Sequence, residues 1–384
     1  MLDAELPAGP PRLVVAEGDS RTIGGAVGEQ TATMVQHSLA SYERRFRDDA
    51  GLSAADVNRW GGIYLDVAGE YDSRIRDMLV GLAEAVDVAP ERIAALNART
   101  EMLYGTGYRE GGCTAAAVLP EVTADGHTLL GQNWDWRTEQ ARSTFVLATR
   151  DDEGHTTIAL TEAGMFAKSG MNGAGLGVCA NLLVSGDDRG GRGVPYHFLL
   201  RGALEARRMS QAHRKLLPVP RISSGNVLLA DAGGEAIDFE LAPDTFGVLH
   251  PEDGLITHAN HFESGIDVVD RRRASSALTL IRARRARRLL ARRSGAITPA
   301  TLAEVFRDRY SWPDSICRYP DPDLPPQERF ATLFSIVMDL DDQVFWIAPF
   351  PVDEQPFYRW SLREVFGGAP EPRVEFPPVQ EVTP

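Results

Sequence analysis

The pattern of apolar residues changes abruptly at Cys113, and this change constrains the fold more than any other feature of the chain. Before it, apolar residues recur at helical spacing. The clearest stretch has them at i, i+3, i+4 and i+7: Ile75, Met78, Leu79 and Leu82. After it, short β-branched or apolar runs alternate with turns. The sequence therefore predicts a mostly helical segment over residues 1–112 and a strand-rich body over residues 113–384.

The body contains a series of predicted strands. They lie at 115–119, 127–131, 144–149, 156–161, 175–180, 226–231, 235–240, 255–258, 331–339 and 343–348. Turn residues such as Ala124-Asp125-Gly126 separate neighbouring runs and predict hairpins. Helices interrupt the strands at about 196–216, 272–293 and 299–308. This order of strands and helices is typical of an α+β fold whose layers include antiparallel sheet.

The segment before Cys113 is predicted in less detail. Val14 and Val15 indicate a short strand near its start. Helices are predicted over about 28–49 and 70–88, and a further helix begins at Pro90, because proline is tolerated in a first helical turn.

Charge and cysteine content exclude several classes of protein. The net charge of −14 disfavours binding to nucleic acid through the overall field. Three cysteines without a C-x-x-C pair predict neither a disulfide framework nor a metal knuckle, and we expect no metal ion or cofactor. There is no apolar signal sequence and no run of roughly 18 apolar residues. We therefore expect a cytoplasmic protein without a membrane segment.

Three other patterns have ordinary explanations. The Arg-rich stretch 271–293 could bind nucleic acid, but its apolar stripe favours an amphipathic surface helix. The run Gly173-Ala174-Gly175-Leu176-Gly177 lacks the spacing of a dinucleotide-binding loop. His258 and His261 have no carboxylate or cysteine partner close in the sequence, so a zinc site is disfavoured.

Cys113 follows two glycines, and further motifs surround it in a fixed order. They are Leu96-Asn97-Ala98-Arg99-Thr100-Glu101, Gly111-Gly112-Cys113-Thr114, Gln132-Asn133-Trp134-Asp135, Gly170-Met171-Asn172, Asn181-Leu182, His258-Ala259-Asn260-His261 and Ile316-Cys317-Arg318. Over roughly residues 60–360, this set resembles the acyl-coenzyme A:6-aminopenicillanic acid acyltransferase family, self-processing N-terminal-nucleophile (Ntn) hydrolases also grouped as peptidase family C45. The resemblance implies a four-layer αββα sandwich, in which two antiparallel sheets lie face to face with helices outside.

The resemblance also implies that the chain cuts itself between Gly112 and Cys113. The two fragments, 1–112 and 113–384, would stay together as a heterodimer. Cleavage would free an α-amino group on Cys113, whose ordinary pKa near ~8 suits a general base for the thiol, so no separate histidine is required. Gly111 and Gly112 would allow the unusual backbone conformation that an N-to-S acyl shift needs.

The resemblance assigns roles to residues around the nucleophile. Asp135 corresponds to the carboxylate that orients the Cys113 amine. Asn181 corresponds to the oxyanion donor, and Asn260 to a second polar group close to the amine or the oxyanion. Arg282 is chosen, from several neighbouring arginines, as the arginine that family members place near the nucleophile.

The resemblance also indicates a substrate pocket. Trp134 and Trp136 are expected to line the part that holds the acyl group. His258 is a further expected substrate-binding residue. Gln132 is also assigned to substrate binding, and it stands where related bile-salt-type hydrolases carry arginine, so strong recognition of a carboxylate beside the nucleophile is not expected.

These features predict a self-processing amidohydrolase or acyltransferase. Cys113 would attack a small amide or thioester, with acyl-CoA among the candidates, and an acyl-enzyme would pass its acyl group to water or to an amine. Two alternatives stay open. In the first, the chain is uncut and His258 or His261 serves as the base for Cys113. In the second, the protein is an inactive relative that acts by binding, which the presence of Asp135 and Asn181 disfavours.

Overall fold

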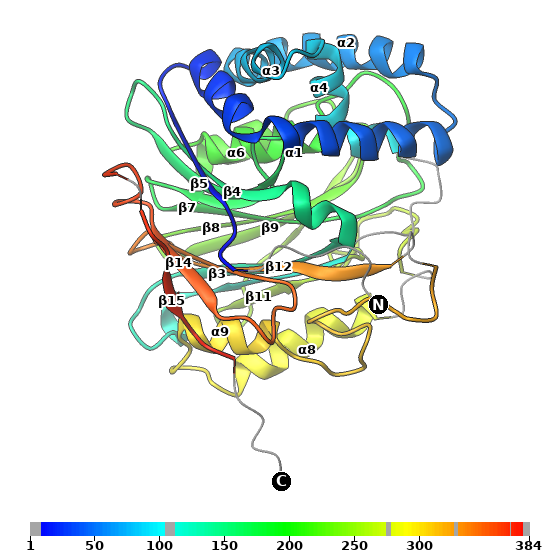
Figure 1. Cartoon of the computed structure of the whole chain (residues 1–384). Coiled ribbons are helices and arrows are strands. Elements are labelled where there is room, and N and C mark those ends of the chain that lie inside the picture. Colours follow the sequence, from blue (N-terminus) through cyan, green and yellow to red (C-terminus); the bar gives the residue numbers. More distant parts are fainter. Residues whose placement is uncertain (1–8, 104–111, 274–277, 326–328, 369, 379–384) are drawn as a thin grey trace.

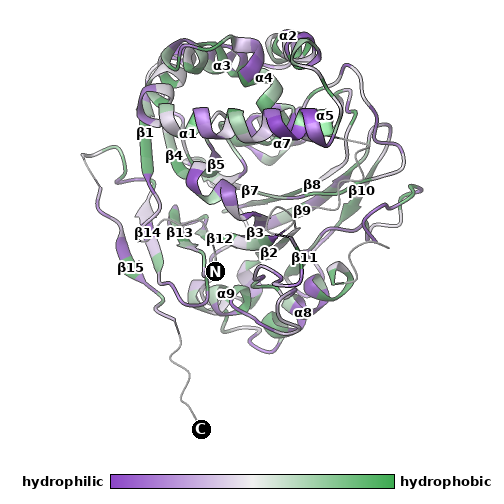
Figure 2. Ribbon diagram, turned by 45° about the vertical axis from the view of Figure 1, so that its right-hand side comes forward, coloured by the Kyte–Doolittle hydropathy of each residue, from purple (hydrophilic) through white to green (hydrophobic). Residues whose placement is uncertain are grey.

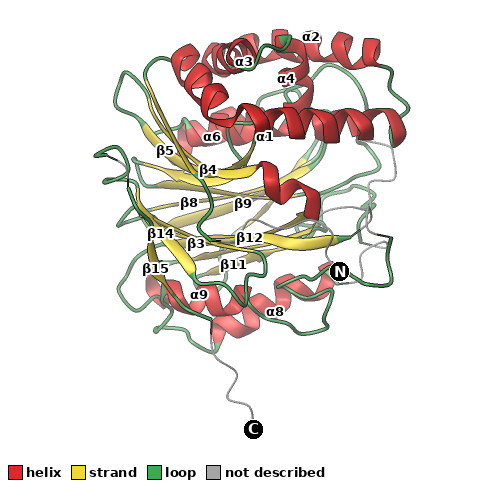
Figure 3. Ribbon diagram, viewed as in Figure 1, coloured by secondary structure: helices red, strands yellow, loops and turns green. Residues whose placement is uncertain are grey.

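The computed structural model describes residues 9–103, 112–273, 278–325, 329–368 and 370–378. Two β-sheets lie face to face, and helices cover both outer faces (Figures 1 and 3). The predicted α+β fold with four αββα layers is therefore confirmed. Gly111, to which the sequence analysis gives a backbone role, lies outside the described residues.

The larger sheet has eight strands. In spatial order they are β1 (Leu13–Glu17), β4 (Thr144–Arg150), β5 (Thr156–Glu162), β6 (Ser169–Asn172), β7 (Leu176–Asn181), β8 (Gly225–Asp231), β9 (Glu235–Leu241) and β10 (Phe246–Leu249). Neighbours pair antiparallel except β1 and β4, which are parallel. The sheet is thus antiparallel, as expected, except at this edge, where the N-terminal segment adds β1 beside β4 and buries Val14 and Ala16.

The smaller sheet has seven strands, all antiparallel to their neighbours. In spatial order they are β11 (Leu255–His258), β2 (Gly112–Val118), β3 (Leu129–Arg137), β12 (Phe330–Asp339), β13 (Val344–Pro349), β14 (Phe357–Ser361) and β15 (Arg373–Glu375). The hairpin of β2 and β3 places Gly112 opposite Asp135 and Cys113 opposite Trp134. The motif that contains Cys113 and the motif that contains Asp135 therefore lie side by side on one pair of strands.

Helices before Cys113 cover the larger sheet. They are α1 (Ser20–Asp48), α2 (Ala54–Tyr71), α3 (Ser73–Ala85), α4 (Pro90–Asn97) and α5 (Arg99–Leu103). Their starts follow from local sequence. Asp19 accepts a hydrogen bond from the Thr22 amide, and Ser53 with Asp56 forms a capping box at the start of α2.

Further helices belong to the body. They are α6 (Tyr196–Leu204), α7 (Met209–Leu216), α8 (Thr279–Ala291) and α9 (Pro299–Phe306), with short 3-10 turns at Pro120–Val122 and Thr138–Ser143. α6 and α7 join the helices on the larger sheet, whereas α8 and α9 cover the smaller one (Figure 1). The single helix predicted over 196–216 is two helices, interrupted at 205–208.

Apolar side chains from both sheets fill the space between them. Val146, Ile158 and Leu228 from the larger sheet belong to one buried cluster with Leu130 and Ile336 from the smaller. Burying each such side chain contributes about 1.5–3 kcal/mol. The outer helices carry hydrophilic as well as hydrophobic residues, as α1 and α3 show in Figure 2. Among the described helices, none combines the length and the apolar content that a membrane span requires.

Candidate active site

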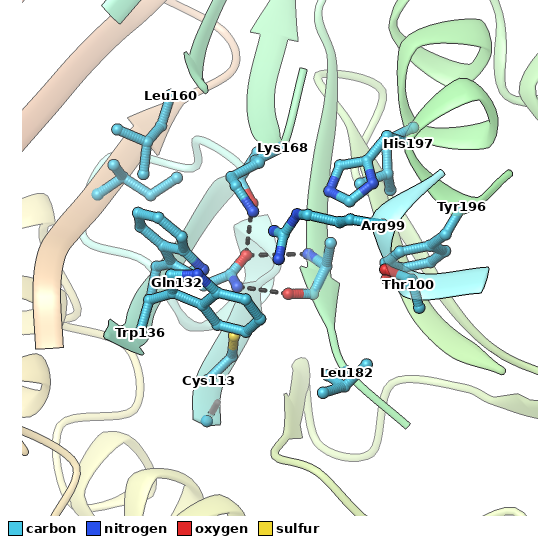
Figure 4. A pocket seen from close by; sticks show the side chains of 16 residues that line it. Arg99, Thr100, Cys113, Gln132, Trp136, Leu160, Lys168, Leu182, Tyr196 and His197 are labelled. Atoms are coloured by element: carbon cyan, nitrogen blue, oxygen red, sulfur yellow. Dashed lines mark hydrogen bonds between the residues drawn. The ribbon is translucent and has the colours of Figure 1, made fainter. Parts of the chain in front are cut away.

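Cys113 is the second residue of β2 and lines a cavity of about 50 Å³ (Figure 4). Both sheets and the helices α5 and α6 contribute to the wall of this cavity. Gly112, Gln132, Trp134 and Trp136, which the sequence analysis assigns to cleavage or substrate binding, line it together with Cys113. The structure therefore brings these five predicted residues to one place.

The main chain of Cys113 is held on both sides by side chains from distant segments. Its amide N–H donates to Asn260 Oδ1 at 2.8 Å. Arg282 Nη1 donates to the Cys113 carbonyl at 2.6 Å and to the Thr114 hydroxyl at 2.8 Å. Arg282 and Asn260 are both buried, so water does not weaken these contacts.

The amide group of Asn260 is fixed in one orientation. Its Oδ1 accepts from the Cys113 amide and from Arg282 Nη2, both at 2.8 Å. Its Nδ2 donates to the Leu182 carbonyl at 2.9 Å. Because its oxygen accepts from both Cys113 and Arg282, the amide of Asn260 presents an acceptor to the nitrogen of Cys113.

Asp135 is completely buried beside Gly112. Its Oδ1 accepts from the Thr332 hydroxyl at 2.7 Å, and Arg282 Nη1 lies 4.0 Å from its Oδ2. Among the described residues, that Oδ2 has no hydrogen-bond partner. Burial raises the pKa of Asp135, although Arg282 lowers it. Burial thus favours the protonated form of a carboxyl group that faces the predicted cleavage site.

The side-chain amide of Gln132 is engaged in hydrogen bonds within the protein. Its Oε1 accepts from the Ser169 hydroxyl at 2.5 Å and from the Ala180 amide at 2.9 Å, and its Nε2 donates to the Ala180 carbonyl. Trp134 and Trp136 stack with ring centroids 6.0 Å apart. The cavity wall thus offers aromatic surface, and Gln132 mainly fixes the sheets to one another.

Asn181 and His258 lie outside the residues that line the cavity. Asn181 Nδ2 donates to the His258 carbonyl at 3.5 Å, the outer limit for a hydrogen bond, so this donor is weakly engaged. His258 Nε2 lies 2.7 Å from Glu240 Oε1. Burial alone would lower the pKa of His258, but Asp238 and Glu240 raise it to about 9. His258 is therefore held away from the substrate cavity by an internal ion pair.

The Cys113 thiol is not activated by its surroundings. Burial and the Asp135 carboxylate raise its pKa to about 11. Attack by the thiolate at neutral pH therefore requires a base that takes the proton.

The sequence alone does not predict a charged cluster that lies in the wall of the cavity. Arg99 of α5 and Lys168 both line the cavity and both bind Glu162 of β5. Arg99 belongs to the motif Leu96-Asn97-Ala98-Arg99-Thr100-Glu101, whose spacing assigns no role to the arginine. Lys168 lies in no motif, and the signal available in the sequence was that lysine is very rare in this chain.

Among the described residues, one group of three side chains has the spacing of a metal site: Asp125, His127 and Asp339. It lies at the turn between β2 and β3, the opposite end of the hairpin from Cys113. It is therefore separate from the cavity.

The architecture and the site define the class first. Two sheets face to face between helical layers, with a cysteine at the start of the strand next to the edge of one sheet, form an Ntn-hydrolase fold. The family follows from sequence comparison. Residues 122–349 match the family Acyl-coenzyme A:6-aminopenicillanic acid acyl-transferase. Acyl-coenzyme A:6-aminopenicillanic-acid-acyltransferase 40 kDa form from Emericella nidulans is 30% identical over 270 residues, which cover 69% of this chain and 72% of that protein. The chain belongs to this acyltransferase family.

Two solved structures are similar to this chain at lower sequence identity. Penicillin V acylase from Agrobacterium tumefaciens is 13% identical, with 66% of this chain and 87% of that chain covered and a TM-score of 0.44. A variant of conjugated bile acid hydrolase from Clostridium perfringens is 14% identical, with 70% and 100% covered and a TM-score of 0.40.

Proposed function

We propose that this protein cuts itself between Gly112 and Cys113 and then transfers acyl groups through the Cys113 thiol. The observation that carries the proposal is the double placement of Cys113. Its thiol lines a cavity, and its nitrogen is held by Asn260 next to the Asp135 carboxyl. An N-terminal cysteine formed there would have its nucleophile and its base on one residue.

In the cut protein, the new α-amino group takes the thiol proton. Its ordinary pKa near ~8 makes it a base around neutral pH. In this proposal Asn260 Oδ1 and Asp135 Oδ2 accept hydrogen bonds from this amine and direct its lone pair to the thiol. The bond of Asn260 to the uncut Cys113 nitrogen, and the lack of a partner for Asp135 Oδ2 among the described residues, support these roles. The thiolate then attacks the substrate carbonyl, and the weakly engaged Nδ2 of Asn181 is the proposed donor to the oxyanion.

The proposed substrates are small amides and acyl thioesters. The Emericella relative is named for acyl-coenzyme A and 6-aminopenicillanic acid, and acyl-coenzyme A is accordingly a candidate donor here. The aromatic wall of Trp134 and Trp136 favours an apolar acyl group. Water or an amine would accept the acyl group from Cys113. No metal or cofactor takes part in this scheme.

The two products of cleavage, 1–112 and 113–384, would remain one particle. The first contributes β1 to the larger sheet and Arg99 to the buried contact with Glu162. The three cysteines are free thiols, which fits a reducing compartment, so a cytoplasmic location stays part of the proposal.

The uncut Cys-His alternative has less support. His258 is bound to Glu240, and His261 Nδ1 lies 3.2 Å from the Thr279 hydroxyl. Neither histidine is among the residues that line the cavity with Cys113. A base for the thiol would have to come from elsewhere in the site.

The test is the intact mass of the purified protein beside its Cys113→Ala variant. We expect two fragments, beginning at Met1 and at Cys113, from the native chain and one chain from the variant. Cys179→Ala removes another buried thiol and should leave cleavage unchanged. A native chain that stays whole over days at neutral pH would refute the proposal. Small N-acyl amides and thioesters are then screened for acylation of Cys113.

A further inference from the structure

Two cations share one carboxylate oxygen in the wall of the Cys113 cavity. Arg99 Nη2 lies 2.7 Å and Lys168 Nζ 2.8 Å from Glu162 Oε1. The second oxygen of Glu162 accepts from the Tyr42 hydroxyl at 2.6 Å. All four side chains are buried. When both cations are protonated, Arg99, Lys168 and Glu162 together carry a net charge of +1.

Only Lys168 can release that charge. The guanidinium of Arg99 does not lose its proton in proteins, and by itself it balances Glu162. Burial and Arg99 lower the pKa of Lys168 to about 8, against the opposing effect of Glu162. Lys168 can therefore lose its proton while Glu162 stays balanced by Arg99, and part of the Lys168 population is neutral near neutral pH.

A lysine at position 168, in place of an arginine, suits a group that exchanges protons. The chain contains 38 arginines and two lysines, Lys168 and Lys215. Arginine would supply the same charge to Glu162 and a stronger forked contact, but it could not accept a proton. Of the two lysines, Lys168 lines the cavity, with Nζ 4.4 Å from the centre of the Trp134 ring.

Self-cleavage needs such a group before any α-amine exists. In the uncut chain the Cys113 nitrogen is a peptide N–H that donates to Asn260, so it cannot take the thiol proton. The other titratable groups that line the described cavity are poor acceptors. Burial lowers the pKa of His197 well below its ordinary value, and burial raises that of Tyr196 well above.

We propose that Lys168 accepts the thiol proton of Cys113 during self-cleavage, an inference that rests on the proposed function. The cavity exceeds the roughly 10–15 Å³ that one water needs, so a water can bridge the two side chains. The Sγ atom attacks the Gly112 carbonyl carbon, and a bond from that carbon to sulfur forms. Asp135 gives its proton to the nitrogen of Cys113, and the peptide C–N bond breaks.

The remaining steps balance without a co-reactant other than water. Water hydrolyses the thioester to the Gly112 carboxylate and the Cys113 thiol and releases one proton. Lys168 is left protonated, and Asp135 is left as a carboxylate facing the new amine. The ionised Asp135 is then the group that orients the amine in the proposed mature enzyme.

In the part of the chain that the structure describes, ionisable groups from several elements surround Lys168 and its partner Glu162. They are Tyr42 of α1, Arg99 of α5, Cys113 of β2, Glu162 of β5 and His197 of α6. Near neutral pH the charges of Arg99 and Glu162 offset one another. The rate of self-cleavage should therefore rise with pH and level off above about 8, following the pKa of Lys168.

The experiment follows cleavage of freshly refolded full-length chain by mass spectrometry between pH 6 and 10. Lys168→Arg keeps the charge beside Glu162 and removes the acceptor, and Lys168→Met removes both. We expect both variants to cut at least about 100-fold more slowly than the native chain at pH 8, the lower range for general-base catalysis. Their rates should keep rising above pH 8, where hydroxide replaces Lys168.

Two controls separate this role from a structural one. Lys215→Arg changes the other lysine, whose Nζ binds Asp72 at 2.8 Å, and should keep the native rate and pH profile. Tyr42→Phe weakens the support of Glu162, keeps Lys168, and should preserve the rise and plateau. A Lys168→Arg variant that cuts with the native rate and profile would overturn the inference. A native chain that never cuts would instead refute the proposed function.

Discussion

Arg282 and Asn260 are joined by a buried hydrogen bond of 2.8 Å, and both also bind the main chain of Cys113. This contact decides the orientation of the Asn260 amide, because a guanidinium can only donate. The oxygen of Asn260 is thereby turned to the nitrogen that becomes the α-amine. Arg282 thus positions the base of the proposed reaction through Asn260.

Replacement of Arg282 by methionine should destabilise the chain and slow its cleavage. The variant leaves Asp135 without its cation and the Cys113 carbonyl without its donor. We expect a loss of about 3 kcal/mol in the free energy of unfolding. Urea unfolding in the uncut Cys113→Ala background measures this loss without a change in covalent state.

Arg285→Met is the matched control on the same helix. Arg285 pairs with Asp308 at 2.5 Å in a partly buried position away from Cys113, so its loss should cost less than that of Arg282, about 1–2 kcal/mol. Equal losses for Arg282→Met and Arg285→Met would contradict the buried role of Arg282.

The hairpin that holds Cys113 and Asp135 could be predicted from the sequence, but its register could not. The turn around Asp125-Gly126 indicates a hairpin, and Gly126 has the positive φ of 78° that such turns favour. Counting back from that turn would pair Gly112 with Glu139, whereas the structure pairs it with Asp135, because the connection also includes the 3-10 turn Pro120–Val122. Arg282 was harder to select, because 271–293 contains ten arginines, and burial by the fold decides which of them reaches the cysteine.

Replacement of Asn181 by aspartate should reduce turnover and spare self-cleavage. The variant keeps the volume of the side chain and removes the Nδ2 donor that we assign to the oxyanion. We expect kcat to fall about 100-fold with KM little changed, as for the loss of one oxyanion donor. Hydrolysis of a small N-acyl amide by the cut protein is the measurement, and intact mass confirms cleavage. An unchanged kcat would exclude Asn181 from this role.

Stability should fall as the pH rises through the titration of His258. Its pKa is raised from 6.5 to about 9, so the folded protein binds this proton more tightly than the unfolded chain. The contribution is fully present below pH 6.5 and is lost as pH rises through about 9. We expect the free energy of unfolding of Cys113→Ala to lose about 1–3 kcal/mol from this group over that range.

His258→Gln in the same background isolates this effect. The difference in unfolding free energy between the two proteins cancels the titrations that do not depend on His258, including that of Lys168, whose lowered pKa acts with the opposite sign. A difference that stays constant between pH 6 and 9 would contradict the assigned ion pair with Glu240.

The charged cluster around Lys168 could not be predicted from the sequence. Arg99, Glu162 and Lys168 come from an N-terminal helix, a strand and the loop after that strand, and no local spacing connects Arg99 to the other two. Their meeting depends on the packing of the N-terminal helices on the larger sheet. The parallel pairing of β1 with β4 has the same origin, since strand periodicity indicates a strand but not its partner.

Gly112→Ala should block self-cleavage by a local clash. A Cβ atom on Gly112 would lie 2.6 Å from Asp135 Oδ2, closer than real Cβ contacts. Asp135 has little freedom to retreat, because its other oxygen is bound to Thr332 at 2.7 Å inside the sheet. Either the carboxyl or the peptide to be cut must shift, and a misplacement near 1 Å at a reacting centre costs about 100-fold in rate.

The rate of cleavage, followed by mass spectrometry, should therefore fall at least about 10-fold in Gly112→Ala. Gly25→Ala is the control, because its added Cβ meets no atom nearer than 3.9 Å and a helical alanine is favoured over glycine. That variant should cut at the native rate and be slightly more stable. If Gly112→Ala also cuts at the native rate, then Asp135 does not approach the cleavage site as the structure places it, and its proposed role as proton donor to the departing nitrogen is wrong.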